Sequence, residues 1–473
     1  MQIYKNKNKF NICSALKLVV ESCNNCKHCT TKFKPIEIFF SHDDNLFKIV
    51  KANTICSSKN YYTDVHFIFN INDPILLFNN FDKTYKKKNN MLILEKPYVS
   101  EKLIQIAVEN HYPVLRNAIS EQLHSQGYSL DLYEDEQFAL AYQQRKRLYC
   151  MSENGLGWIN KYIDDKELKD KIALLKDKTA FRRICQKMYP NFYFKEVQLQ
   201  DLYQLNAKEI LFPIVLKPSI GFLSVGVYIV HDEREWQNAL LDIKEKFAVA
   251  SSQFPDFVVG TANYLIEEYI QGAEYAVDAY FDNEGQPIIL NIYHHRFASE
   301  SDTSDRLYCS SKALYDQYEQ PFTDFLINVN RVVGLRNFPM HIEFRLSGEV
   351  PIPIEINPLR FAGFCLNELQ THISGIHPVV AFFENMRISK NDMWKGRETD
   401  TFSFMVLERP KQVAKNAVFD KDKFIHSFSG VLELREVTTA DVGVVATAFV
   451  CTDKQHQSEL DTLLRFDMMD FMK

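Results

Sequence analysis

Two short alternating stretches joined by a turn constrain the fold more than any other part of this chain. Residues 341–346 alternate between polar and apolar side chains, and residues 352–357 place isoleucine at every second position. A period of two predicts strands in both stretches. A hairpin folded about Glu349 would put Glu343 directly across from Glu355, and His341 across from Asn357. Like charges at directly opposed positions destabilise a sheet, so this pairing calls for a compensating partner.

The composition is that of an ordinary globular protein. The chain has 473 residues, with 46% hydrophobic and 25% charged side chains, and this length predicts two to four domains. A net charge of −6 gives no reason to expect nucleic acid as a partner. No apolar run approaches the roughly 18 residues that a membrane helix needs. Polar residues interrupt the apolar stretch near the N-terminus, so we expect no secretory signal.

The first 90 residues differ from the rest. Residues 1–90 carry a charge balance of +7 with no arginine, whereas the remainder carries −13. The lysine run at 86–88 is typical of a solvated linker, and Met91 then opens a stretch that predicts a strand, a turn, an amphipathic helix and a second strand. We interpret residues 1–90 as an appended N-terminal extension or an upstream reading of the same frame, which makes Met91 a candidate start.

Five of the ten cysteines lie in this extension. Cys23, Cys26 and Cys29 form a C-x-x-C-x-x-C run that could bind zinc or an iron–sulfur cluster, with Cys13 or Cys56 as a fourth ligand. No second C-x-x-C completes the pattern, and three reduced thiols remain the simpler interpretation. The scattered remaining cysteines indicate a reduced, cytoplasmic protein.

Beyond residue 170 the pattern predicts an α+β fold. A helix over 177–190 precedes strands at 212–219 and 226–232, a helix at 232–248, and strands at 264–270, 273–282 and 286–297. The strands pair as hairpins, and no G-x-G-x-x-G is present, so a dinucleotide-binding fold is not expected. The predicted domains are 1–90, an α/β domain at 91–170, a central domain at 171–395 and a small C-terminal α+β subdomain at 396–473.

The segment around Lys217 has the features of a phosphate site. Lys217 ends an apolar strand, and a buried lysine is costly unless an anion meets it. The connection that follows offers glycines and hydroxyls that allow close approach to phosphate oxygens: Ser219, Gly221, Ser224 and Gly226. A simple β-hairpin would explain the same pattern.

Acidic residues follow the next apolar strand. Glu267 and Glu268 precede Ile270, and Glu274 lies just past Gly272. The same spacing suits the solvated face of an edge strand. Together with the Lys217 segment, it also suits a nucleotide hinge, in which backbone groups contact adenine and a carboxylate holds the ribose hydroxyls.

In this order, these elements resemble the ATP-grasp superfamily over roughly residues 91–400. The resemblance implies two α+β subdomains that clasp ATP, preceded by an α/β domain. It assigns Lys178 and Lys217 to the ATP phosphates, residues 219–226 to the flap, Glu267–Ile270 to the adenine hinge and Glu274 to the ribose. It assigns three residues to Mg²⁺, with Mn²⁺ as an alternative: Glu343, Glu355 and Asn357.

The chain departs from the family after Asn357. An arginine commonly follows the Asn-Pro pair directly, whereas here Leu359 intervenes and Arg360 comes one residue later. The catalytic arginine, which would hold the transferred phosphate or a substrate carboxylate, is therefore either Arg360 or Arg296.

The resemblance implies a ligase that activates a carboxylate as an acylphosphate for attack by an amine. The implied partners are small-molecule acids and amines. Neither nucleic acid nor a membrane is implied as a partner, and the resemblance leaves undecided whether the chain forms a homodimer. One alternative is a biotin-carboxylase-like enzyme acting on bicarbonate, which would need a separate biotin carrier because no biotinylation motif is present. Another is a nucleotide-binding regulatory module without turnover, which the intact pair of Glu343 and Glu355 disfavours.

Overall fold

The computed structural model describes residues 90–219, 226–253, 263–299, 304–414, 417–437 and 443–473, together with the backbone of three earlier strands. The chain divides into two compact units, Met1–Tyr85 and Lys86–Lys473. In the first unit, an antiparallel sheet of order β1-β2-β3 contains Glu37–Phe40, Leu46–Lys51 and Phe67–Asn70. Cys13, Cys23, Cys26, Cys29 and Cys56 lie outside the described residues, so the predicted metal site there stays a prediction.

The second unit begins with an α/β layer, as the sequence predicts. Its parallel sheet has the order β6-β5-β4-β7. Every residue of β4 is buried, which fits a central strand with helices nearby. The Ser100 side chain caps the first helix by accepting a hydrogen bond from the Leu103 N–H. The elements are β4 (Asn90–Ile93), α3 (Glu101–Asn110), β5 (Pro113–Leu115), α4 (Ala118–Ser125), β6 (Asp131–Tyr133), α5 (Asp135–Arg145), β7 (Arg147–Cys150) and α6 (Asn154–Tyr162).

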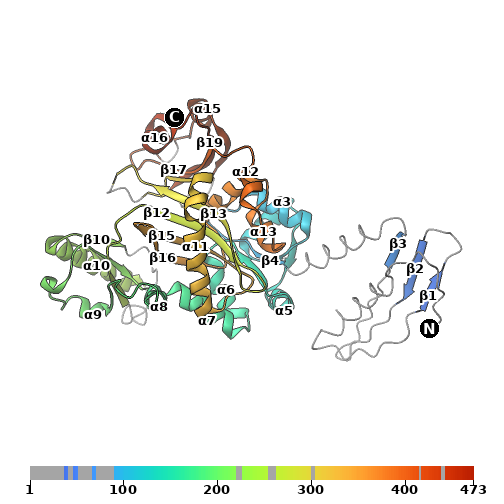
Figure 1. The fold of residues 1–473 in the computed structure, drawn as a ribbon, viewed down its shortest axis with the longest axis horizontal. Helices are drawn as coiled ribbons and strands as arrows, with labels where there is room; N and C mark the ends of the chain where they lie inside the picture. Colours follow the sequence, from blue (N-terminus) through green and yellow to red (C-terminus); the bar gives the residue numbers. More distant parts are fainter. Residues whose placement is uncertain are drawn as a thin grey trace. The chain divides into compact units, whose positions relative to one another are not determined.

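A small antiparallel sheet follows two connecting helices (Figure 1). Its strand order is β10-β9-β11-β8, and α10 packs its Trp236 and Ile243 into the core beneath it. The elements of this part are α7 (Lys166–Lys176), α8 (Lys178–Cys185), β8 (Phe194–Gln198), α9 (Leu199–Leu202), η1 (Ala207–Glu209), β9 (Ile214–Pro218), β10 (Tyr228–Val230), α10 (Glu233–Gln253) and β11 (Asn263–Glu268).

The largest sheet has eight strands in the order β16-β15-β12-β13-β14-β17-β19-β18. Helix α11 (Lys312–Val333) crosses one face of it (Figure 1). The C-terminal strands extend the same sheet through the pairing of β14 with β17. The strands are β12 (Glu274–Phe281), β13 (Pro287–Arg296), β14 (Leu307–Ser311), β15 (Phe338–Ser347), β16 (Val350–Pro358), β17 (Thr401–Glu408), β18 (Val431–Glu436) and β19 (Val444–Thr452).

Short helices link the strands of this sheet and close its C-terminal end. The 3-10 helix η2 follows the chain that leaves β16, and α15 and α16 pack with η4 against β17 and β19. The helices are η2 (Gly363–Glu368), α12 (Leu369–Ser374), α13 (Pro378–Phe383), α14 (Lys390–Met393), α15 (Lys421–Ser427), α16 (Glu459–Arg465) and η4 (Met468–Phe471).

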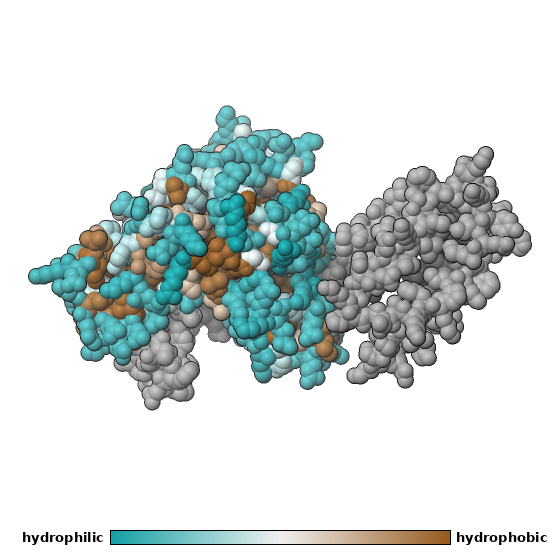
Figure 2. Space-filling model, turned by 60° about the horizontal axis from the view of Figure 1, so that its bottom comes forward, coloured by the Kyte–Doolittle hydropathy of each residue, from teal (hydrophilic) through white to brown (hydrophobic). Residues whose placement is uncertain are grey.

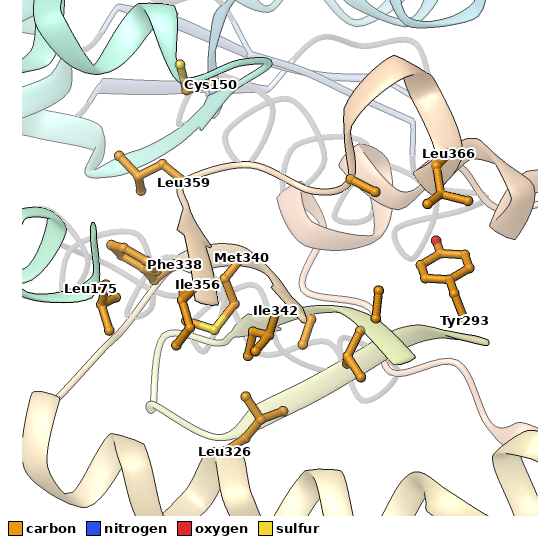
Figure 3. Close-up of a cluster of buried hydrophobic side chains, with 14 of the residues drawn as sticks. Cys150, Leu175, Tyr293, Leu326, Phe338, Met340, Ile342, Ile356, Leu359 and Leu366 are labelled. Atoms are coloured by element: carbon orange, nitrogen blue, oxygen red, sulfur yellow. The ribbon is translucent and has the colours of Figure 1, made fainter. Parts of the chain in front are cut away.

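The main core lies between the large sheet and α11. Ile342 and Ile356 point into it together with Met340 and Leu326 (Figure 3), and all four side chains are buried. Ile342 and Ile356 belong to the apolar half of the alternation in residues 341–357. Burial of this face, at roughly 25 cal/mol per Å² of apolar surface, anchors the hairpin and leaves its opposite face for polar side chains.

The surface in Figure 2 is mainly hydrophilic, with hydrophobic side chains in a few patches. Exposed apolar residues of the small-sheet part include Leu211, Val227 and Leu241. No helix in the described part of the chain is both long enough and apolar enough to cross a membrane. The five described cysteines, Cys150, Cys185, Cys309, Cys365 and Cys451, carry free thiols.

Candidate functional site

The predicted hairpin forms, and the predicted register holds at the carboxylate pair but not nearer the turn, where Ser347 pairs with Val350. Glu343 pairs with Glu355 and His341 with Asn357 across the antiparallel strands β15 and β16. A bulge between Glu343 and Phe344 then shifts the register by one residue, so that Arg345 faces Ile352. The bulge interrupts the pairing directly beside the carboxylate pair, and bulges often re-aim side chains next to functional sites.

The two carboxylates have different electrostatic environments. The Nζ of Lys178 lies 2.8 Å from Oε2 of Glu355, and the Asn357 amide donates to Glu355 Oε1 at 3.2 Å. Burial alone would raise the pKa of Glu355, but Lys178 outweighs it and lowers that pKa to about 2. Burial raises the pKa of Glu343 well above its usual value, and the charge of Glu355 adds to this effect.

This arrangement fits a hard divalent cation. The two carboxylates and the Asn357 amide oxygen are donors that Mg²⁺ accepts, and Mg²⁺ usually completes its octahedron with phosphate and water oxygens. Within the described residues, no three His, Cys, Asp or Glu side chains form a metal cluster by themselves. The donor set therefore fits an ion shared between protein and phosphates, for which Glu343, Glu355 and Asn357 are candidate ligands.

Lys217 is buried, and its counter-ion is Glu267. The Lys217 Nζ lies 2.5 Å from Glu267 Oε1, and Arg182 contacts the other oxygen at 2.8 Å. Each of the three side chains is only 3% exposed. Burial lowers the pKa of Lys217, while the charge of Glu267 opposes that effect. Two cations thus share one carboxylate, and an excess positive charge remains next to Lys178, which suits a polyanionic ligand.

The hinge segment beside this cluster lines a cavity. Two of its backbone N–H groups are already bonded, from Glu268 to the Tyr193 carbonyl at 3.0 Å and from Tyr269 to the Pro213 carbonyl at 3.1 Å. Because Glu267 points into the ion cluster, adenine contacts would fall to the segment 268–270. The cavity has a volume of about 360 Å³ and is lined by Leu211, Phe212, Pro213, Glu268, Tyr269, Ile270, Gln271, Ser347 and Ile352.

Glu274 lies at the start of β12 and is held by two basic side chains. His295 Nδ1 lies 2.9 Å from one oxygen, and the Arg345 guanidinium lies 3.2 Å from the other. Burial alone would raise the pKa of Glu274, but the hydrogen bond from His295 and the charges of His295 and Arg345 lower it. The carboxylate is therefore ionised and fixed in place, as an acceptor for hydroxyl groups would be.

The predicted flap is only partly described. Gly221 and Ser224 lie outside the described residues. Ser219 is buried, its backbone carbonyl accepts from the Lys178 N–H at 2.9 Å, and its hydroxyl lies 2.9 Å from that of Thr179. Ser219 thus joins β9 to the start of α8. At Gly226 a Cβ would meet only ordinary van der Waals contacts, so packing does not require glycine there.

The two arginine candidates have separate surroundings. Arg296 makes an exposed ion pair with Asp461 of α16 at 2.9 Å. Arg360 lies 3.3 Å from Glu153, and its charge is among those that act on Glu343. The charge of Arg360 thus acts to lower the pKa of Glu343, whereas Arg296 is paired with Asp461.

Leu359 explains why the arginine comes one residue late. Its φ is 60°, in the left-handed region, and its side chain is buried in the main core (Figure 3). A left-handed residue ends the alternation of β16, so the next side chain takes a new direction. Non-glycine residues with this backbone conformation are uncommon and often mark functional sites.

Comparison with known proteins identifies one domain of this chain. Residues 210–368 match the ATP-grasp domain family. The chain contains an ATP-grasp domain. The matched residues include Lys217, the hinge and the hairpin, whereas Lys178 precedes them. A curated relative, the uncharacterized protein y4rH of Sinorhizobium fredii, is 26% identical over 167 residues, which cover 34% of this chain and 30% of that protein. The chain thus spans less than a third of that relative.

Solved structures share the ATP-grasp fold over most of the chain. An L-amino acid ligase from Bacillus licheniformis has a TM-score of 0.56 at 15% identity, covering 81% of this chain and 98% of that one. N5-carboxyaminoimidazole ribonucleotide synthetase from Thermotoga maritima has a TM-score of 0.55 at 12% identity, with the same coverages. Biotin carboxylase from Campylobacter jejuni has a TM-score of 0.52 at 14% identity and covers 77% and 87%.

Two buried polar residues, Arg182 and Asp278, had no role assigned from the sequence. Arg182 lies one helical turn after Lys178, and that i, i+4 spacing placed both on one face of α8. Asp278 is buried in β12 and accepts from His341 at 2.9 Å, from the Tyr293 hydroxyl at 2.8 Å and from the Ala362 N–H at 2.9 Å. The signal for Asp278 in the sequence was a single acidic residue within an apolar strand.

Proposed function

We propose that the chain is an ATP- and Mg²⁺-dependent ligase that activates a substrate carboxylate and joins it to an amine. The observation that carries this proposal is the opposed pair of Glu343 and Glu355 with Lys178 beside it. A ligand-free sheet gains nothing from two facing carboxylates, whereas a cation bound with nucleotide phosphates offsets their repulsion.

In the proposed reaction, a carboxylate oxygen attacks the γ-phosphorus of ATP, the bond to ADP breaks, and an acylphosphate forms. An amine nitrogen then attacks the acyl carbon, and phosphate leaves as the nitrogen loses its proton. Lys178 and Lys217 would stabilise the phosphate charge, and Arg360 would hold the anionic acyl group in place. Mg²⁺, when bound, supplies charge neutralisation at the transferred phosphoryl group. The side chains mainly position and stabilise charge.

The nucleotide contacts follow from the same geometry. Residues 268–270 would contact adenine through the cavity beside them, and the fixed carboxylate of Glu274 would accept the ribose hydroxyls. Among the fold neighbours, an L-amino acid ligase and a phosphoribosylglycinamide synthetase carry names that favour carbon–nitrogen bond formation, so an amine is our preferred nucleophile.

The test is ADP release from ATP and Mg²⁺ against pooled small carboxylates, with and without pooled amines. The proposal expects carboxylate-dependent ADP release that increases when amines are added. Bicarbonate is assayed in a separate arm, because biotin carboxylases share the fold. Turnover with bicarbonate alone would favour that alternative. Nucleotide binding with no release in any arm would favour a regulatory module and contradict the ligase proposal.

A further inference from the structure

Arg360 is held by a residue of the α/β layer. The Glu153 Oε1 lies 3.3 Å from an Arg360 terminal nitrogen, and Glu153 Oε2 lies 2.5 Å from the Lys176 Nζ. Glu153 directly precedes α6, whereas Lys176 ends α7, two residues before Lys178. One carboxylate therefore connects the arginine after β16 to the junction that carries the phosphate lysine.

The backbone around Glu153 is fixed from two sides. The Met151 N–H donates to the Ile93 carbonyl at 2.9 Å, and the Cys150 N–H donates to the Leu359 carbonyl at 2.8 Å. The second bond attaches the segment to the residue before Arg360. Close packing adds to this, since a Cβ at Gly155 would lie 2.3 Å from the Cys150 sulfur. Glu153 is thus presented to Arg360 by a rigid turn.

The Arg360 guanidinium is only partly satisfied. Its side chain is 16% exposed, one terminal nitrogen donates to the Phe361 carbonyl at 3.1 Å, and its buried Nε has no hydrogen-bond partner among the described residues. The contact to Glu153 is the one ion pair of this guanidinium among the described residues, and together with the bond to Phe361 it leaves donors free. Guanidinium groups with free donors bind carboxylates and phosphates in a two-point geometry.

We propose that Glu153 is a positioning residue that orients Arg360 toward the anionic group of the acid substrate or its acylphosphate. This inference rests on the proposed function. Glu153 also pairs with Lys176, so Arg360 adds its free donors to the charges of Lys178 and Lys217 that act on the carboxylate pair. Loss of the Glu153 charge lets the guanidinium swing away and lowers the rate of the first step.

A labelling experiment tests the contact without any substrate. Phenylglyoxal modification of the full chain is followed at each arginine by mass spectrometry, in the wild type, Glu153→Gln and Glu153→Asp. We expect the rate at Arg360 to rise about threefold or more in Glu153→Gln and less in Glu153→Asp, which keeps the charge. Glu196→Gln is the matched control, since it releases Arg183 and should leave Arg360 unchanged. An unchanged Arg360 rate in Glu153→Gln would overturn the proposal.

Kinetics then test the role. With the carboxylate pool that supports ADP release, Glu153→Gln should lower kcat about tenfold and leave the KM for ATP unchanged. In an Arg360→Gln background, the same change should have no further effect, because Glu153 acts through Arg360. Additive losses, or a raised KM for ATP, would contradict the positioning role. If the wild type itself shows no carboxylate-dependent turnover, the proposed function fails while the labelling result still decides the contact.

Discussion

Lys178 lies 2.8 Å from Glu355, whereas Glu343, directly opposite on β15, has no lysine or arginine within ion-pair distance among the described residues. The pKa values move apart accordingly, down to about 2 for Glu355 and upward for Glu343. The two carboxylates therefore contribute differently to the stability of the metal-free protein, although both are candidate ligands of one cation.

The first prediction compares Glu343→Gln with Glu355→Gln. In the metal-free protein, Glu343→Gln should keep or raise the melting temperature, because it removes a partly buried carboxylate that faces another one. The repulsion that is relieved is roughly 0.2–1 kcal/mol. Glu355→Gln should lower it, since Lys178 loses its partner. Because the pKa of Glu343 is higher in the folded than in the unfolded protein, wild-type stability falls as the pH rises above the pKa of the unfolded state. The gain in stability from Glu343→Gln should therefore grow from pH 5 to pH 8.

Both variants should lose ATP turnover, and added Mg²⁺ with nucleotide should stabilise them less than the wild type. Melting temperature and ADP release on the same preparations check this. An active Glu355→Gln protein with a normal response to Mg²⁺ would refute the metal assignment. A Glu343→Gln protein that melts lower than Glu355→Gln would refute the asymmetry.

The second prediction concerns the buried cluster of Arg182, Lys217 and Glu267. Lys217→Met should weaken ATP binding strongly and cost little stability, because Glu267 keeps Arg182 as its partner. Glu267→Met should cost more, roughly 3–5 kcal/mol, since two buried cations lose their only shared carboxylate. Denaturant unfolding and nucleotide titration measure the two effects. The exposed pair of Arg183 and Glu196 gives the control, because Arg183→Gln should change stability by less than about 1 kcal/mol.

Equal destabilisation by Lys217→Met and Glu267→Met would contradict this reading of the cluster. Unchanged nucleotide affinity in Lys217→Met would remove Lys217 from the phosphate site.

The existence of the hairpin was predictable because the alternation that defines its strands is local. Its register was not fixed by the predicted turn at Glu349, since Ser347 pairs with Val350 and the strands leave the turn one residue off the predicted pairing. The bulge after Glu343, for which the alternation gives no sign, restores the predicted pair of Glu343 and Glu355. The i, i+4 relation of Lys178 and Arg182 was visible, but its partner Glu267 lies 85 residues away in the chain.

Other contacts depend on tertiary structure alone. Leu359 departs from the family pattern, and its left-handed backbone and its burial, which precede Arg360 in the chain, could not be predicted from the sequence. In the sequence, Glu153 is one acidic residue in a polar segment. Its contact with Arg360 could not be predicted, because the two residues are 207 positions apart in the chain. Sequence patterns describe single elements well, whereas contacts between distant elements require the fold.

The third prediction is a pH dependence set by Glu368, which is buried near the start of α12. Burial alone would raise its pKa, but the hydrogen bond and charge of His377 and the charge of Arg435 lower it to about 2. A depressed folded pKa contributes stability above the unfolded value near 4.5, and this contribution is lost as pH falls from about 4.5 toward 2. Glu368→Gln should therefore lower stability at pH 7 by about 3 kcal/mol, since it leaves buried charges unpaired.

The variant should also lose less additional stability on acidification than the wild type does between pH 5 and pH 3. Urea unfolding at several pH values measures both quantities. If both proteins lost the same stability between pH 5 and pH 3, Glu368 would not be the source of this pH dependence. Glu433→Gln, which removes a more exposed partner of Arg435, should have a smaller effect.

The fourth prediction concerns the N-terminal extension. The boundary between the two compact units lies between Tyr85 and Lys86. Strand β4 begins at Asn90, whose side chain is buried. A chain that begins at Lys86 should therefore bind ATP with the affinity of the full chain. A start at Met91 removes Asn90 from its pairing with Arg147, so this shorter chain should be less stable. Failure of the Lys86 chain to fold or bind would show that the extension is needed.

The last prediction concerns Gly272, which joins the hinge to β12. Its φ is 129°, and a Cβ there would lie 2.0 Å from the Leu346 carbonyl oxygen of β15, so Gly272→Ala forces the backbone to move. We expect a loss of roughly 1–3 kcal/mol and weaker ATP binding, since Tyr269 and Glu274 flank the shifted segment. Gly157→Ala in α6 is the control: nothing lies within 4 Å of its Cβ position, and a helical alanine should add about 0.5–1 kcal/mol. Thermal unfolding and nucleotide titration on both variants decide the matter, and a Gly272→Ala protein with wild-type affinity would show that the hinge tolerates this displacement.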